Sequence, residues 1–165
     1  MTTYYVSGNG SDSNDGLSSG APKATIAGIP NTGGVFTGGN TTIYFEAGTT
    51  ITNTSGSTWS VSSGATLTLR AYGGGTRPLI NCSGSGSGFK TTGSGSLLDA
   101  QDIQLIKAAT TATAIDAQGG GSLRASNVKV SGWGMGIRGG SETILVEDCE
   151  VLQPLRSCIF VEALA

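Results

Sequence analysis

The chain has 165 residues, enough for one domain with a sizeable core, and its formal net charge is −2. Although it contains 28 Gly, 37% of its residues are hydrophobic and only 12% are charged, which argues against disorder. Its nine basic residues are scattered and no apolar run approaches the roughly 20 residues of a membrane span, so we expect neither nucleic acid nor membrane as a partner.

The chain begins with a strand signal and a turn-rich loop. Residues 4–16 read YYVSGNGSDSNDG, in which the aromatic and β-branched run favours a strand and the Gly, Ser, Asn and Asp that follow favour turns. The spacing of side-chain oxygens resembles a calcium loop, at Asn9, Ser11, Asp12, Asn14 and Asp15. The bidentate Glu of an EF-hand is missing, so we expect no cofactor and keep calcium as the alternative.

Internal repeats follow from about residue 40. The segments TIYFEAG and TLTLRAYG align, with Ile43 and Phe45 matched to Leu67 and Leu69. Three later segments share an apolar residue, an Asx four positions on, and then two apolar residues in alternation: LDAQDIQL at 98–105, LRASNVKV at 123–130 and ILVEDCEV at 144–151. Their Asx positions are Asp102, Asn127 and Asp148.

A second register accompanies the first, because Ile115, Ile137 and Ile159 are each 22 residues apart. Alternation at period two indicates strands, and a coil of about 22 residues cannot bury its apolar side chains unless it stacks on its neighbours. The sequence therefore predicts a parallel β-helix of about five to six coils, with the three Asx residues in one column of turns, where Asx tolerates left-handed dihedrals. A propeller needs longer repeats, and a sandwich would show hairpin signals without this period.

The segment TYYVSGNGSDSNDGLSSGAPKATI, residues 3–26, resembles the N-terminal segment of right-handed parallel β-helix proteins of the pectate-lyase-like superfamily. The resemblance implies a right-handed β-helix at 41–165, with the strand, loop and cap at 1–40 closing one end of the stack. The cap helix usual in the family is interrupted by Gly28, Pro30 and the glycines at 33–34, so we expect a loop or single turn there. The family also implies a polysaccharide partner, since it includes uronate lyases, glycoside hydrolases and bacteriophage tailspikes.

No catalytic constellation stands out. The chain has no His, which excludes Ser-His-Asp and Cys-His arrangements, and its three Cys show no metal-ligand spacing and are interpreted as buried small residues. In the family a Lys or Arg serves as the lyase base, which makes Lys129, Arg124 and Arg138 the first candidates, with Lys107 and Arg156 behind them. A hydrolase would need two nearby carboxylates, and Asp116 meets Glu150 or Asp148 only if the coil faces coincide. The alternative interpretation of all these charges is a solvated surface.

Three aromatic residues, Trp59, Tyr72 and Trp133, lie in or beside Gly/Ser-rich turns. Such a ring either stacks on a sugar or fills a gap in the wall of the stack. Trp133, within GWGMG, is the first glycan-contact candidate.

The last residues, SCIFVEALA, are strand-like with no polar closing coil, so we expect either more chain beyond them or a partner that covers the end, through a homo-oligomer or end-to-end stacking. No signal peptide follows Met1, so either a leader has been replaced or the protein leaves its cell by another route, as in a virus particle.

The sequence leaves two hypotheses for the function. One is a non-enzymatic glycan-contacting module of a virion (tail fibre or tailspike-like) or cell surface, and the other is the N-terminal part of a polysaccharide lyase or glycoside hydrolase. An extracellular or virion-surface location is expected in either case.

Overall fold

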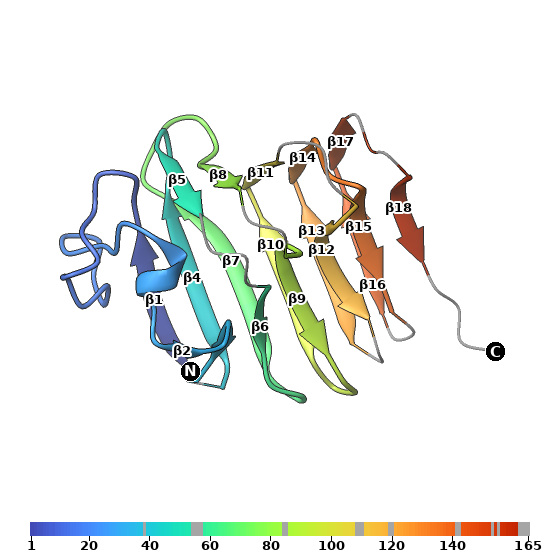
Figure 1. Ribbon diagram of the computed structural model, residues 1–165, viewed down its shortest axis with the longest axis horizontal. Coiled ribbons are helices and arrows are strands. Elements are labelled where there is room, and N and C mark those ends of the chain that lie inside the picture. Colours follow the sequence, from blue (N-terminus) through green and yellow to red (C-terminus); the bar gives the residue numbers. More distant parts are fainter. Residues whose placement is uncertain are drawn as a thin grey trace.

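The computed structural model describes residues 1–37, 39–53, 58–83, 86–107, 111–118, 121–140, 143–152, 154 and 156–161. The fold is all-β with three sheets (Figure 1). The six-stranded sheet contains, in spatial order, β1 (Thr2–Val6), β4 (Thr41–Glu46), β7 (Thr66–Tyr72), β10 (Leu97–Gln101), β13 (Ser122–Ser126) and β16 (Ile144–Glu147). The five-stranded sheet contains β5 (Thr50–Asn53), β8 (Leu79–Cys82), β11 (Gln104–Lys107), β14 (Lys129–Ser131) and β17 (Glu150–Leu152). The seven-stranded sheet contains β2 (Asn31–Thr32), β3 (Val35–Phe36), β6 (Trp59–Val61), β9 (Phe89–Thr92), β12 (Thr113–Gln118), β15 (Met135–Gly139) and β18 (Ser157–Val161).

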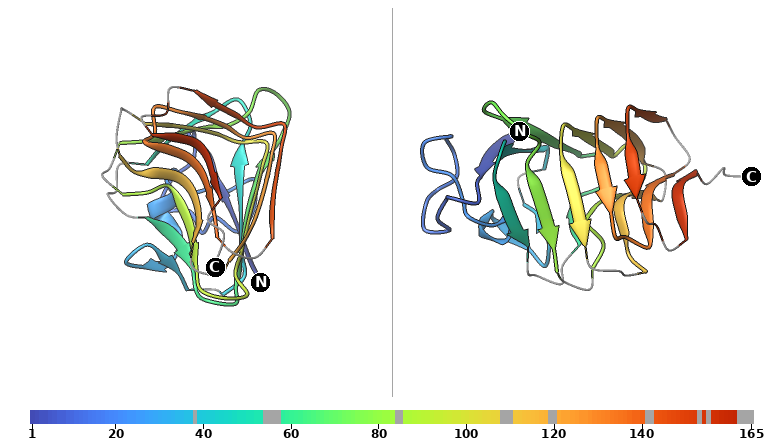
Figure 2. Two further views of the ribbon diagram at one scale, coloured as in Figure 1. Left: turned by 90° about the vertical axis from the view of Figure 1, so that its right-hand side faces the viewer. Right: turned by 90° about the horizontal axis from the view of Figure 1, so that it is seen from above.

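From β4 onward, successive strands join the six-, five- and seven-stranded sheets in rotation. The strand pairs are parallel, apart from the antiparallel pair of β2 and β3. Parallel neighbours need a long crossover, and here the crossover is made by strands of the other two sheets. Figure 2 shows the successive circuits lying one behind another around a shared interior. The arrangement is consistent with a β-helix or solenoid. Within the described ranges, no helix is long and apolar enough to cross a membrane.

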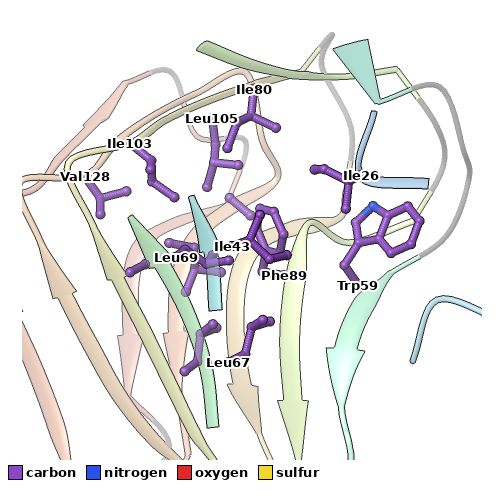
Figure 3. Packing of buried hydrophobic residues seen from close by; sticks show 14 of the residues in the cluster. Ile26, Ile43, Trp59, Leu67, Leu69, Ile80, Phe89, Ile103, Leu105 and Val128 are labelled. Atoms are coloured by element: carbon purple, nitrogen blue, oxygen red, sulfur yellow. The ribbon is translucent and has the colours of Figure 1, made fainter. Parts of the chain in front are cut away.

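The core lies between the three sheets and is built from columns of like residues. Leu67, Leu98 and Leu123 are register partners in the six-stranded sheet, and each is at most 1% exposed. Ile80 and Leu105 are partners in the five-stranded sheet and also point inward (Figure 3). Burial of such a side chain contributes about 1.5–3 kcal/mol, so the columns hold the circuits together.

The column of Asx residues is confirmed. Asp102, Asn127 and Asp148 have φ values of 57°, 53° and 51°, the left-handed region, and each directly follows a strand of the six-stranded sheet. Asn127 Nδ2 donates a hydrogen bond to Asp102 Oδ1 at 2.6 Å. The side chains therefore connect adjacent circuits while the backbone turns toward the five-stranded sheet.

The isoleucine column is also confirmed, since Ile137 pairs with both Ile115 and Ile159. The upstream alignment is wrong by two residues, because Ile43 pairs with Leu69 and not with Leu67. A shift of two residues preserves the alternation of inward and outward side chains, so the hydrophobic pattern cannot detect it.

The N-terminal loop is organised by Asp12. Its Oδ1 accepts hydrogen bonds from the backbone N–H groups of Ala24 and Thr25, at 3.0 and 2.9 Å, and its Oδ2 accepts one from Thr25 Oγ1 at 2.8 Å. Thr25 then caps a single 3-10 turn, η1 (Ile26–Gly28), by accepting from the N–H of Gly28. The expected single turn in place of a cap helix is therefore present.

Each of the last strands described, β16 to β18, carries an exposed apolar side chain. Leu145, Leu152 and Ile159 are 41%, 39% and 47% exposed. Cys158 is exposed as well, so the interpretation of the cysteines as buried is wrong for this residue, whereas Cys82 is buried and burial raises its pKa to about 11. Cys158 lies on β18, an edge strand of the seven-stranded sheet, where no further described strand covers it.

Candidate functional site

Three tyrosines gather on the outer face of the six-stranded sheet. Tyr5 of β1 and Tyr44 of β4 are register partners, and their rings stack with centroids 5.3 Å apart and an interplanar angle of 17°. Tyr72 of β7 meets Tyr5 edge-on, with centroids 5.2 Å apart. All three side chains are half-buried, so parts of the rings remain accessible. We call Tyr5, Tyr44 and Tyr72 the tyrosine platform.

The phenol of Tyr72 is the buried polar end of the platform. Burial, followed by the nearby charge of Glu46 and by Tyr5, raises the pKa of the Tyr72 phenol, which therefore stays protonated at neutral pH. Glu46 is itself the acceptor of a hydrogen bond from Ser7 Oγ. The Tyr72 hydroxyl is buried and makes no hydrogen bond to a described residue, so the accessible parts of the platform are ring surfaces.

A charged hollow adjoins the platform on the same face, over β7, β10, β13 and β16. It has a volume of about 240 Å³, and its polar lining is made by Arg70, Asp99, Gln101, Arg124, Ser126 and Glu147. Arg70, the register partner of Tyr44, forms an ion pair with Asp99 at 2.7 Å and also donates to the Asp99 carbonyl oxygen at 3.1 Å. These contacts hold the Arg70 guanidinium in place between the platform and the hollow.

Arg124 is the candidate from sequence that the structure places in this hollow. It lies on β13 between its register partners Asp99 and Leu145. Its side chain is exposed, and it forms no ion pair with any described residue. The hollow thus combines one guanidinium fixed by a carboxylate with one that remains available to a ligand.

The other two predicted bases lie on different sheets. Lys129 is on β14 of the five-stranded sheet, where its ammonium pairs with Glu150 Oε2 at 3.0 Å. Arg138 is on β15 of the seven-stranded sheet, as the register partner of Asp116. The structure therefore does not bring Arg124, Lys129 and Arg138 together.

The carboxylates considered for hydrolysis are separated in the same way. Asp116 is 4% exposed, in a row with its register partners Lys90 and Arg138 on the seven-stranded sheet. Glu150 lies on the five-stranded sheet, and Asp148 lies in the turn before it. The coil faces do not coincide, so Asp116 meets neither of them.

Both tryptophans belong to the core. Trp59 is 2% exposed and stacks on Phe36 with centroids 5.6 Å apart. Trp133 is 1% exposed and contacts the ammonium of Lys107, which lies 4.6 Å from the ring centroid and donates to the Gly86 carbonyl. Both indoles thus fill the interior, which agrees with the gap-filling interpretation, and among the three predicted aromatic contacts only Tyr72 lies in an accessible cluster.

Polar side chains of the proposed calcium loop already form hydrogen bonds within the N-terminal segment. In addition to the three hydrogen bonds to Asp12, Asp15 Oδ1 accepts from the N–H of Leu17 and the Asn14 amide donates to the Pro22 carbonyl. Asn9 is exposed, and no group of three or more acidic, His or Cys side chains within the described ranges is arranged to hold a metal.

We expect the melting temperature to be unchanged by EDTA, because the carboxylates that calcium would bind already accept hydrogen bonds from the N-terminal loop. Differential scanning calorimetry with and without the chelator checks this. A lower melting temperature that calcium chloride restores would show instead that the loop binds the ion.

The sequence matches no protein-family model and no curated protein. Among solved structures, the chain is similar to a rhamnogalacturonan lyase with a TM-score of 0.40 and 13% sequence identity. The match covers 100% of this chain and 63% of the lyase chain. A likeness at this level does not bear on the function of the chain, which has to be argued from its own surface.

Sequence reasoning missed Tyr5, Tyr44 and Arg70. Each has an outward position in a strand where the alternate residues are buried, and that alternation is visible in YYV, TIYFE and TLTLRAY. What the pattern did not show is that β1, β4 and β7 lie side by side in this register.

Proposed function

We propose that this chain is a right-handed parallel β-helix of about five to six coils that binds polysaccharide as a structural module of a virion, in the manner of a tail fibre or tailspike, or of a cell surface. The single observation that supports the binding role is the tyrosine platform beside a charged hollow on one accessible sheet face. Aromatic rings offer flat apolar surfaces to the faces of sugar rings. Guanidinium and carboxylate groups offer donors and acceptors to the hydroxyls.

Each part of the site has a role in this proposal. Tyr44 and Tyr5 contact the sugar face, and Tyr72 supports Tyr5 through the edge-on contact of their rings. Arg124, Gln101 and Glu147 bind hydroxyls of the next sugar in the hollow. No bond of the glycan is broken, and binding needs no cofactor.

The assembly and location belong to the same proposal. The apolar side chains exposed on β16 to β18 suit contact with a second copy, as a homo-oligomer or by end-to-end stacking. A glycan-binding module of this kind acts at the outside of a virion or cell.

We expect Tyr44→Ala to weaken polysaccharide binding about tenfold, because it removes the central ring of the platform and also the ring that supports Tyr5. Isothermal titration with the best ligand from a panel of acidic and neutral polysaccharides measures this effect. Tyr44→Phe is the matched control, since it keeps the ring, and it should retain most of the affinity. Equal affinity of Tyr44→Ala and the wild type, with both proteins folded, would contradict the proposal.

The alternative is an enzyme, either a polysaccharide lyase or a glycoside hydrolase of which this chain is the N-terminal part. It is favoured by the presence of two carboxylates, Asp99 and Glu147, with Arg124 in one hollow. Incubating the protein with the same panel distinguishes the two functions. New reducing ends or unsaturated-uronate absorbance that disappear in Arg124→Ala would support the enzyme, and binding without cleavage would support the structural module.

A further inference from the structure

A second polar groove lies where the chain turns from the six-stranded to the five-stranded sheet. Two adjoining hollows, of about 690 and 280 Å³, share Gly75, Thr76, Arg77 and Asn127. The segment 73–78 connects β7 to β8 (Figure 1), and its residues Gly73, Gly75, Thr76 and Arg77 line the hollows. We call this feature the corner groove. Its polar side chains include Thr50, Thr76, Arg77, Gln104, Asn127 and Lys129.

The larger hollow of the groove contains one cation that has no paired carboxylate. It is lined by Arg77 and by Lys129, which pairs with Glu150, and by no carboxylate among its described lining residues. The carboxylate that lines the smaller hollow, Asp102, already accepts a hydrogen bond from Asn127. An anion entering the larger hollow would therefore meet cationic and neutral donors.

Arg77 differs from the other cation of the groove, Lys129, which is paired with Glu150. It also differs from Arg70 of the charged hollow, which is held by Asp99. The half-buried Arg77 guanidinium forms no ion pair or hydrogen bond with any residue that the structure describes. A planar guanidinium without a partner is a ready bidentate donor to an oxyanion.

Neutral donors surround it. The exposed hydroxyls of Thr50 and Thr76 and the half-buried amide of Gln104 make no hydrogen bonds to described residues. Their chemistry suits a ligand that is rich in hydroxyl groups as well as negatively charged.

The groove lies next to the tyrosine platform along the chain. The residues on either side of Tyr72, Ala71 and Gly73, line the smaller hollow. A glycan that contacts Tyr72 on the outer face of the six-stranded sheet therefore lies beside the corner groove, one residue along the chain.

We propose that the corner groove binds the negatively charged substituent, a carboxylate or sulfate, of a polysaccharide whose neighbouring sugar ring contacts the tyrosine platform. Arg77 pairs with the oxyanion, Thr76 and Gln104 donate to its oxygens or to sugar hydroxyls, and Lys129 adds positive charge. The inference rests on the proposed function and specifies the charge of its ligand.

The test compares binding of polygalacturonate, dextran sulfate and neutral dextran to the wild type, Arg77→Gln and Arg156→Gln. Arg156 is the matched control, because it is exposed and lines neither hollow of the groove. We expect Arg77→Gln to weaken binding of an anionic probe by about tenfold or more and to leave dextran binding unchanged, since one charge-assisted pair is lost. Added salt should weaken anionic binding to the wild type by screening the charges.

The anionic probes identify the substituent. Selective loss for polygalacturonate indicates a carboxylate, selective loss for dextran sulfate indicates a sulfate, and loss for both indicates a site that accepts either. If Arg77→Gln does not fold, Thr76→Asp replaces it, because it brings a carboxylate into the groove from an exposed position and should cause the same selective loss.

The inference is overturned if the wild type shows no preference for either anionic probe over dextran, or if Arg77→Gln and Arg156→Gln behave alike. In that case a loss of dextran binding in Tyr44→Ala would still support the platform, so the two proposals fail separately. Retention of all binding in Tyr44→Ala would overturn both.

Discussion

Val128→Asp is expected to unfold the chain. Val128 is fully buried directly after the left-handed residue Asn127, and its side chain points into the interior among residues of neighbouring circuits (Figure 3). An aspartate there is a charge without a partner in an apolar core, with a cost of several kcal/mol. Since a domain of this size has a total stability of about 5–15 kcal/mol, the variant should be largely unfolded or aggregated. Circular dichroism and light scattering measure both outcomes.

Leu17→Asp is the matched control. It makes the same change from an aliphatic to a charged side chain at a position in the N-terminal loop that is 58% exposed. We expect a change in the free energy of unfolding within about 0.5 kcal/mol. Wild-type solubility and melting temperature in Val128→Asp would contradict the stacked core itself.

Gly132→Ala is expected to lower the free energy of unfolding by about 3 kcal/mol or more. Gly132 follows β14 with φ +74°, and a Cβ at this position would overlap the backbone carbonyl oxygen of Lys107 in the preceding circuit. A left-handed alanine alone costs about 1–2 kcal/mol, and relief of the overlap would have to move one circuit away from the next. Urea unfolding gives the difference.

Gly64→Ala separates the two contributions. Gly64 has the same φ of +74°, but a Cβ there would have no neighbour within 4 Å. This variant should therefore lose only the about 1–2 kcal/mol due to the backbone conformation. Equal losses in Gly64→Ala and Gly132→Ala would show that the circuits are not packed as closely as the structure has them.

The sequence predictions that were confirmed rest on residues that favour one backbone conformation or recur at a constant spacing. Asx residues recur where the backbone must turn with positive φ, so Asp102, Asn127 and Asp148 could be aligned as turn residues from the sequence. The isoleucine column was found because its spacing of 22 residues is constant. The constant 22-residue spacing and the requirement for positive φ together located the later circuits in the sequence.

The functional face was not predictable in the same way. Tyr44 meets Tyr5 and Arg70 only because β4 pairs with β1 on one side and β7 on the other, and connections of different length separate these strands. Register between circuits is set by the turns and by backbone hydrogen bonds, which the alternation of side chains does not report. The two tryptophans show a second limit of sequence reasoning. A position beside a glycine-rich turn does not say whether the ring points inward or outward.

Because successive strands join three sheets in turn, the alignment of the outward side chains can change while the packing of the inward ones is kept. A loss or gain of two residues in a turn leaves the inward side chains of the next strand facing inward, yet it displaces the outward ones by about 6.6 Å along the strand. A deletion of this kind before β4 would preserve the apolar interior and still separate Tyr44 from Tyr5. The length of a turn therefore sets how the outward side chains of one strand align with those of its neighbour. Different surfaces can be built in this way on the same hydrophobic core.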